Sequence, residues 1–349
     1  MVGLVLPAKL AMNRTMSRIF LCLLACIALF PSNVKAQTGN LQNQWLLHRH
    51  ELSFSGGVSN FLGDLGGRDR IGSDFIYDLE KTLFKTSFAV DYRYYLAKHV
   101  ILRQSIAWHK VAGDDKLTAE AFRNNRNLNF QSNIFEYDMM MEFQFMSMRD
   151  HERHGLKNHS GRRIGWRYRS IGGYFFGGIG TFYFNPTSTY YGSKVKLHEM
   201  HTEGQGLPDG PKQYKRMSVS VPVGMGFRMA INRQWYITLE GSYRFTFTDY
   251  IDDVSGYYYD NQAIADNYGI AAAYMANPSL QNAELIARNG YDPTNAGYQR
   301  GDPTDKDGYM TATIGVHYRF RNKYNPYGGS VKRNNRPYQG KRRMGRMRF

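Results

Sequence analysis

Acidic side chains gather in two short stretches of this 349-residue chain, and these are the residues best suited to chemistry. The first stretch, TDYIDDVSGYYYD, carries Asp249, Asp252, Asp253 and Asp260. An acidic pair beside a histidine can act as general acid and base, as in a barrel protease or lipase. The sequence offers no order of Ser, His and Asp that selects a triad, however. A solvated or hydrogen-bonded loop is the favoured interpretation, and no catalytic residue is assigned.

Metal binding has two further candidates, and neither is favoured. Asp302, Asp305 and Asp307 precede Gly308 in the manner of a calcium loop, but the remaining ligands and the distal glutamate are missing. Three histidines in a basic segment could contact a metal, although a solvated connection explains them better: His151, His154 and His159. We therefore expect neither a metal nor another cofactor.

The elements that position these residues begin after an export signal. The apolar run 19–30 follows Arg14 and Arg18 and is too short to cross a bilayer core of about 30 Å. Residues 34–36, Val-Lys-Ala, resemble a signal-peptidase site, so we expect cleavage before Gln37.

Both cysteines, Cys22 and Cys26, lie inside this signal. The mature chain is then expected to have no disulfide, thiol chemistry or cysteine-based metal site. Lipidation of Cys26 is a minor alternative.

The clearest strand pattern lies near the C-terminus, over 307–320, DGYMTATIGVHYRF. Its side chains alternate between an apolar row and a row of small, polar or charged residues, which predicts a strand with one face in each environment. Four of its residues resemble the closing-strand signal that outer-membrane barrels present to the barrel assembly machinery: Thr313, Gly315, Tyr318 and Phe320.

Seven earlier segments show similar alternation, and long and short connections alternate between the strands. The predicted strands are 51–62, 86–96, 100–109, 131–145, 170–183, 217–229, 235–247 and 307–320. Their length suits tilted transmembrane strands, and the asymmetry of the connections is typical of outer-membrane barrels. The fold class predicted is an all-β, eight-stranded antiparallel up-and-down transmembrane β-barrel with long extracellular loops, the last of which, 248–307, has an Ala-rich helical stretch over 263–288.

If the apolar rows face lipid, the opposite rows must fill the lumen. The expected lumen residues are Asp91, Arg93, Arg103, Glu136, Asp138, Glu142, Arg228, Glu240, Arg244, His317 and Arg319. An eight-stranded interior is only wide enough for its own side chains, so these charges predict a plugged barrel and not a porin. Aromatic residues at strand ends are expected to form interfacial girdles: Trp108, Tyr183, Trp235, Phe247 and Phe320.

The formal charge of +16 belongs largely to the C-terminal tail, which carries ten Lys and Arg and no acid. The chain divides into a signal peptide (1–36), a periplasmic lead-in (37–48), the barrel (49–320) and a basic disordered periplasmic tail (321–349). Because an exported tail meets little nucleic acid, an anionic periplasmic partner or lipid head groups are the better candidates.

Two stretches, SGGVSNFLGDLGG (55–67) and RFTFTDYIDDVSGYYYD (244–260), resemble the PorG-like family of Bacteroidetes outer-membrane proteins. This resemblance implies an OmpA-like or OmpX-like barrel within the type IX secretion and gliding machinery, tethering a periplasmic PorK–PorN ring to the outer membrane. Gly63, Asp64, Asp252, Asp253 and Ser255 match its motifs. The resemblance offers no catalytic residues, and bracing loops is the role expected of these five.

The sequence therefore predicts a non-enzymatic component located in the outer membrane. Its expected partners are outer-membrane lipid, the barrel assembly machinery and periplasmic secretion ring proteins. The alternatives are a barrel hydrolase acting on lipid or peptide and a loop-mediated adhesin.

Overall fold

A computed structural model describes residues 49–65, 84–118, 120–146, 171–231 and 234–320. The expected signal peptide, the lead-in and the basic tail lie outside the described residues. So do both cysteines and the three histidines proposed as metal ligands.

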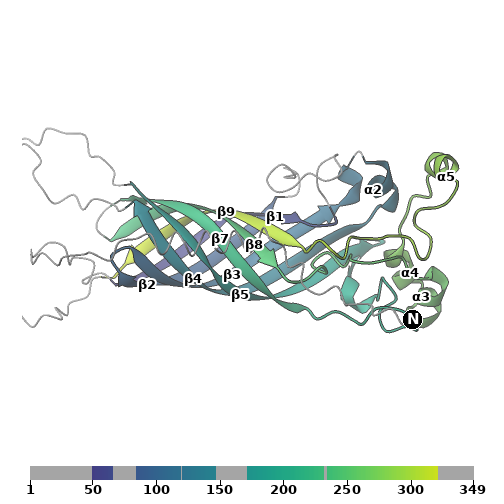
Figure 1. Cartoon of the computed structure of the whole chain (residues 1–349), viewed down its shortest axis with the longest axis horizontal. Coiled ribbons are helices and arrows are strands. Elements are labelled where there is room, and N and C mark those ends of the chain that lie inside the picture. The colour runs from purple at the N-terminus through teal and green to yellow at the C-terminus, as the bar shows by residue number, and fades with distance from the viewer. Residues whose placement is uncertain (1–48, 66–83, 119, 147–170, 232–233, 321–349) are drawn as a thin grey trace, which may run out of the picture. The chain divides into compact units, whose positions relative to one another are not determined.

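Eight long strands form a closed antiparallel barrel, which confirms the predicted fold class (Figure 1). The strands are β1 (His50–Leu62), β2 (Lys85–Ala97), β3 (Val100–Asp114), β4 (Asn129–Met146), β5 (Ile171–Tyr190), β7 (Met217–Ala230), β8 (Trp235–Thr246) and β9 (Gly308–Arg319). Each strand pairs with the next along the chain, and β9 closes the barrel by pairing with β1 from Glu51↔Arg319 to Leu62↔Gly308.

The outer wall of the barrel is apolar, as the alternation predicts. Phe54, Ile106, Ile179, Leu239 and Ile314 each expose more than half of their side-chain surface, on five different strands. A continuous exposed belt of this kind is unstable in water and suits the hydrocarbon core of a membrane. Among the girdle aromatics, the ring of Trp235 lies 5.0 Å from that of Tyr318, which contacts Phe320.

The long connections contain more regular structure than the sequence indicates. β3 and β4 extend to Asp114 and back from Asn129, and β5 continues to Tyr190 and pairs with β6 (Ser193–Lys196), so these strands run beyond the predicted bounds 100–109, 131–145 and 170–183. The Ala-rich stretch forms three short helices, as its composition suggests. The helical segments are η4 (Asp115–Leu117), α2 (Ala121–Arg126), η5 (Leu197–Glu199), α3 (Asn261–Tyr268), α4 (Ile270–Ala276) and α5 (Ala283–Asn289).

We call the described residues of these four connections the cap: 63–65, 115–128 without 119, 191–216 and 247–307. All four emerge at the same end of the barrel, where the helices lie (Figure 1). No helix within the described ranges has the length and hydrophobicity to cross a membrane.

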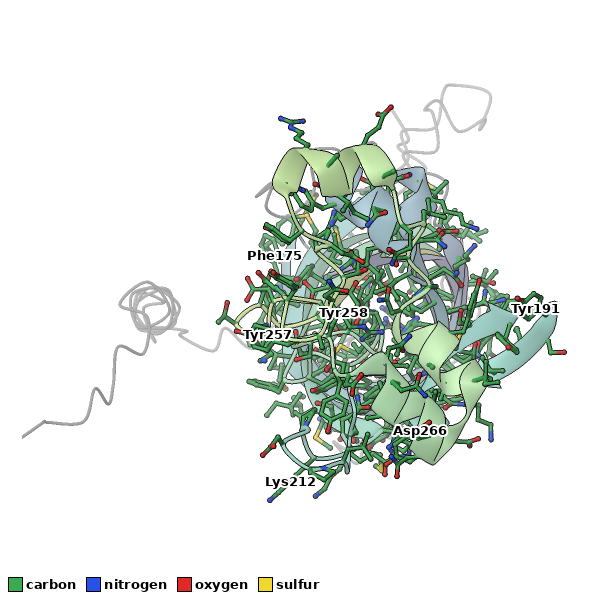
Figure 2. All side chains as sticks on the ribbon, turned by 90° about the vertical axis from the view of Figure 1, so that its right-hand side faces the viewer. Phe175, Tyr191, Lys212, Tyr257, Tyr258 and Asp266 are labelled. Atoms are coloured by element: carbon green, nitrogen blue, oxygen red, sulfur yellow. The ribbon has the colours of Figure 1, made fainter. Side chains whose placement is uncertain are left out.

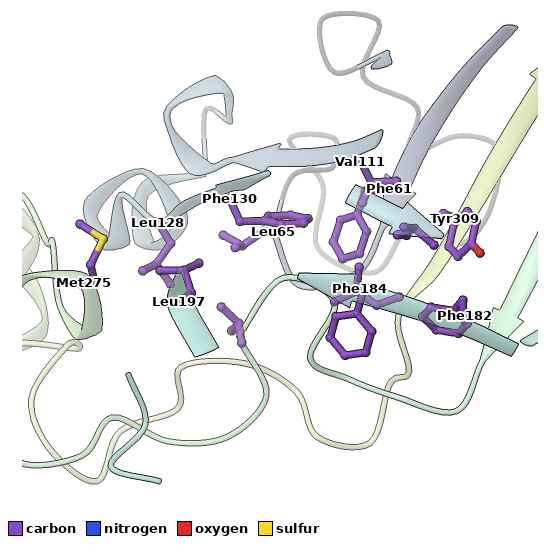
Figure 3. Close-up of a cluster of buried hydrophobic side chains, with 13 residues drawn as sticks. Phe61, Leu65, Val111, Leu128, Phe130, Phe182, Phe184, Leu197, Met275 and Tyr309 are labelled. Atoms are coloured by element: carbon purple, nitrogen blue, oxygen red, sulfur yellow. The ribbon is translucent and has the colours of Figure 1, made fainter. Parts of the chain in front are cut away.

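An apolar core, which the sequence did not indicate, joins the cap to the barrel (Figure 3). Phe61, Val111, Phe182 and Phe184 point inward from the cap ends of their strands. They pack with six residues from the cap: Leu65, Leu128, Leu197, Ile251, Val254 and Met275. The barrel interior is therefore polar in the part away from the cap, and hydrophobic side chains close the end that the cap covers. We call this end the mouth.

Candidate functional site

The charged interior is organised around Arg93 on β2, whose side chain is completely buried. Its Nε atom lies 2.6 Å from Oε1 of Glu142, and Nη2 lies 3.0 Å from Oε1 of Glu240. Its Nη1 atom contacts Oδ2 of Asp91 at 3.2 Å. A planar guanidinium with five donors suits three carboxylates at once, which a lysine could not satisfy with the same geometry.

Arg103 on β3 completes the central layer. It lies 2.8 Å from Oε2 of Glu240, 3.1 Å from Oδ1 of Asp91 and 3.5 Å from Oε1 of Glu142, so both arginines share the same three carboxylates. Tyr174 on β5 donates a short hydrogen bond to Glu240. This layer draws on β2, β3, β4, β5 and β8, and thus ties together strands on opposite sides of the barrel.

The charged side chains on the side of this layer away from the cap also form ion pairs. Arg319 lies 2.5 Å from Oε1 of Glu51, which also accepts a hydrogen bond from Tyr95 at 2.8 Å. Arg228 contacts Glu142 at 2.9 Å. Of the eleven residues expected in the lumen, ten are buried and Arg319 is partly buried, so the plugged interior predicted from the sequence is confirmed.

Between the central layer and the apolar core lies a chain of hydrogen bonds that was not predicted from the sequence. Ser87 Oγ lies 2.8 Å from Nδ1 of His109, and Nε2 of His109 lies 3.1 Å from Oε2 of Glu136. Arg244 holds the same carboxylate oxygen at 3.1 Å. Serine, histidine and glutamate in contact are the parts of a hydrolase triad. These three are almost fully buried beneath the apolar core, however, and the ring of Tyr309 lies 5.7 Å from that of His109, which leaves a substrate no route to Ser87.

In the cap, the structure brings together the two stretches that carry the family resemblance. The backbone N–H of Leu65 donates to Oδ2 of Asp252 across 187 positions of sequence, at 3.2 Å. Asp64 accepts from the N–H of Asp302 at 2.8 Å, and Asp307 accepts from the N–H of Ile251 at 2.8 Å. We call Asp64, Asp249, Asp252 and Asp307 the acid cluster.

Burial sets the protonation of this cluster. It raises the pKa of Asp252 well above the usual range, and the charge of Asp64 adds to the shift. Burial likewise raises the pKa of Asp307, with further contributions from Asp252 and Asp249. The pKa of Asp249 rises to about 7, again mainly through burial. These carboxyl groups lie close enough to repel one another when ionised.

Asp253 points away from the acid cluster into a separate group of contacts. Its carboxylate accepts hydrogen bonds from the hydroxyl groups of Thr202 at 2.5 Å and Tyr214 at 2.6 Å. Burial raises the pKa of Asp253 to about 6. Next to it, the N–H of Ser255 donates to Glu203, which pairs with Arg300 at 3.0 Å.

The contacts of the other candidate residues are structural. A Cβ on Gly63 would lie 2.2 Å from Oδ1 of Asp307, so only glycine fits there. Asp260 caps α3 by accepting from the N–H of Gln262. Asp302 and Asp305 are exposed while Asp307 is buried, so the structure does not bring these three carboxylates together. The described residues hold no group of three side chains able to bind a metal.

On β9, Thr313 is buried and faces the lumen, and Phe320 extends the pairing by donating its N–H to the carbonyl of His50 at 2.9 Å. A side chain on Gly315 would meet Thr238 and Ser55. The role of Thr313, Gly315, Tyr318 and Phe320 as an assembly signal stays a prediction.

The chain is similar in structure to several small outer-membrane barrels. The attachment invasion locus protein Ail of Yersinia pestis, in complex with the heparin analogue sucrose octasulfate, is 12% identical, with a TM-score of 0.33 over 78% of this chain and 99% of Ail. Neisserial surface protein A is 6% identical, with a TM-score of 0.34 over 78% of this chain and 97% of its own. The N-terminal barrel of Pseudomonas aeruginosa OprF is 7% identical, with a TM-score of 0.29 over 78% and 99%.

Comparison with curated proteins found no match to the sequence. One family model does match, over residues 40–268, which include seven of the eight barrel strands and much of the cap. The chain belongs to the family described as Domain of unknown function (DUF6089).

Proposed function

We propose that the protein is a non-enzymatic outer-membrane barrel that anchors a periplasmic assembly of the type IX secretion and gliding class. The observation that carries this proposal is the sealed interior. Ion pairs fill the lumen around Arg93, and hydrophobic side chains close its capped mouth. A barrel of this kind is unsuited to conduct solutes and acts through the surfaces it presents on either side of the membrane.

The apolar belt supports a location in the outer membrane, where closed β-barrels are found. The resemblance to PorG-like proteins supports the choice of assembly. Its motif residues brace the cap through Leu65, Asp252 and Asp64, in keeping with a structural role. The short turns and the basic tail then supply the periplasmic contact surface.

The test is crosslinking in cells with the full chain, followed by identification of the attached periplasmic proteins. Three chains are compared: the wild type, a deletion of residues 321–349, and a tail of equal length in which the ten Lys and Arg are replaced by Gln. The deletion should leave a folded, inserted barrel and reduce the recovery of ring proteins, and the Gln tail separates charge from length. Recovery of no periplasmic protein by the wild type would overturn the anchor.

A hydrolase is the first alternative, and Ser87 gives it a specific test. Ser87→Ala should leave secretion and any lipase or protease activity of the purified barrel unchanged, because Ser87 has no exposed surface. Loss of a measurable activity in this variant, with the barrel still folded, would favour the hydrolase.

A loop-mediated adhesin is the second alternative, and one feature of the cap favours it. Tyr191, at the tip of the β5–β6 hairpin, exposes 86% of its side chain and lies at the edge of the cap in Figure 2. Its ring contacts those of Tyr190 and Tyr274, with centroids 4.7 and 6.0 Å away. Reduced adhesion of cells carrying Tyr191→Ser, with secretion unchanged, would support this second role.

A further inference from the structure

Three of the four members of the acid cluster are buried, and the fourth, Asp64, is half-buried. Asp249, Asp252 and Asp307 expose 4%, 1% and 2% of their surface, and within the described residues none of the four members forms an ion pair. Oδ2 of Asp249 is buried and has no hydrogen-bond partner among the described residues. A buried ionised carboxylate without an opposite charge is strongly unfavourable, and three of them beside the half-buried Asp64 are more so.

The cations around the cluster are already engaged. Arg126 pairs with Asp115 at 2.7 Å, and Arg300 pairs with Glu203. The ammonium group of Lys306 donates to the carbonyl of Pro303 at 2.7 Å. The charged groups that face the cluster from η4, α2, the β5–β7 connection and the β8–β9 connection are Asp115, Arg123, Arg126, Glu203, Asp302 and Lys306.

We propose that protons on the acid cluster lock the cap onto the barrel mouth, and that the cap loosens when these protons leave. The closed cap binds protons that an open, hydrated cap releases. Opening is therefore favoured by high pH, the reverse of ordinary acid denaturation.

The contacts of the cluster show which part would loosen. Asp252 holds the N–H of Leu65, and Asp307 holds that of Ile251. Both Leu65 and Ile251 belong to the apolar core that closes the mouth. When Asp252 and Asp307 are ionised, they repel each other and move apart, and Leu65 and Ile251, which are hydrogen-bonded to them, move with them. This movement would expose the apolar core, while the strand pairing of the barrel stays intact.

Hydrogen exchange measures this directly in the mature full-length protein in detergent micelles. Exchange is followed from about pH 5 to pH 9 and corrected for the intrinsic dependence on pH. Peptides that contain Leu65 and Ile251 report on the cap, and a peptide within β8 serves as the internal reference. If opening releases one proton, protection should fall about 10-fold per pH unit around and above the range where the cluster ionises. The β8 peptide should not follow this trend.

The double variant Asp252→Asn/Asp307→Asn keeps side-chain shape while removing both ionisable groups. It should retain at pH 9 the protection that the wild type has at pH 5. Asp266→Asn, on the exposed face of α3 (Figure 2), is the matched control and should behave as the wild type. If the double variant does not fold, Asp249→Asn removes one ionisable group of the cluster without the loss of a backbone hydrogen bond, and it should weaken the dependence of protection on pH.

Three results would overturn the proposal. The first is wild-type protection that does not change with pH, and the second is a pH dependence as steep in the double variant as in the wild type. The third is a restoration of protection at pH 9 by millimolar calcium in the wild type and not in the double variant, because the cluster would then be a cation site.

Discussion

Removing the guanidinium of Arg93 should destabilise the barrel more than any single change on its surface. Arg93→Met fills a similar volume but leaves three carboxylates without their shared cation: Asp91, Glu142 and Glu240. Breaking a buried ion pair by removing one partner costs about 3–5 kcal/mol, because the remaining charge is buried and uncompensated. Arg103 still contacts all three carboxylates, so we expect a loss within this range.

The assay is equilibrium unfolding in urea of the refolded barrel in lipid vesicles, followed by tryptophan fluorescence. Lys98→Met in the exposed β2–β3 turn is the surface control and should change the free energy of unfolding by no more than about 0.5 kcal/mol. Arg93→Lys keeps the charge and loses the forked geometry, so its loss should be intermediate.

A double variant separates lost charge from lost packing. Adding Glu142→Gln to Arg93→Met removes one uncompensated charge and should recover part of the lost stability, which is a coupling of about 1 kcal/mol or more. A loss below about 1 kcal/mol for Arg93→Met alone, or no recovery in the double variant, would refute the view that these ion pairs depend on one another.

Three further predictions test other parts of the molecule. Gly178→Ala should destabilise the barrel by about 2 kcal/mol, because its Cβ would lie 2.1 Å from the backbone carbonyl oxygen of Met139, whereas Gly241→Ala, with no atom within 4 Å, should be nearly neutral in the same urea assay. Asp253, whose pKa is raised to about 6, binds its proton more tightly in the folded state than in the unfolded state. The free energy of unfolding that this proton contributes should therefore fall by about 3 kcal/mol as pH rises from about 4 to above 6. Asp253→Asn should flatten that part of a thermal-melting profile, and an unchanged slope would contradict the assignment. Tyr191, at φ 43° before Gly192 at φ 83°, occupies a turn that prefers Asn-Gly, so Tyr191→Asn should raise hydrogen-exchange protection of the β5–β6 hairpin by about 0.5 kcal/mol.

The barrel could be predicted from the sequence because lipid imposes a simple rule on every strand. Each outward position must be apolar, so the period of two is visible without any knowledge of pairing, as Met310 to Phe320 illustrate. The inward charges follow by the same alternation, and all of those predicted except Asp138 have an ion-pair or hydrogen-bond partner inside the lumen.

The cap could not be predicted in this way, because its core is assembled from single residues far apart in sequence. Leu65, Leu128, Leu197 and Met275 lie in four different connections, and none belongs to a periodic segment long enough to be recognised. The contact of Leu65 with Asp252 is likewise invisible before the fold is known. Propensity indicates the local helices and says nothing of what they cover.

The hydrogen bond between Ser87 and His109 was within reach of the sequence. Three residues separate the predicted second and third strands, and a hairpin so short fixes its register. That register places Ser87 opposite His109, both on the inward row. The glutamate, on β4, needs a second register and is harder to find.

The two halves of the interior depend on each other. The apolar core at the mouth excludes water from above, so the charges below it must be neutralised by protein groups and not by solvent. This accounts for the forked contacts of Arg93 and Arg103, each shared among several carboxylates. In turn, the ion pairs hold opposite walls of the barrel at fixed spacing, which sets the width that Phe61, Phe182 and Tyr309 must fill above them. Weakening the core would therefore hydrate the ion pairs and loosen their geometry, and breaking the ion pairs would widen the mouth that the core closes.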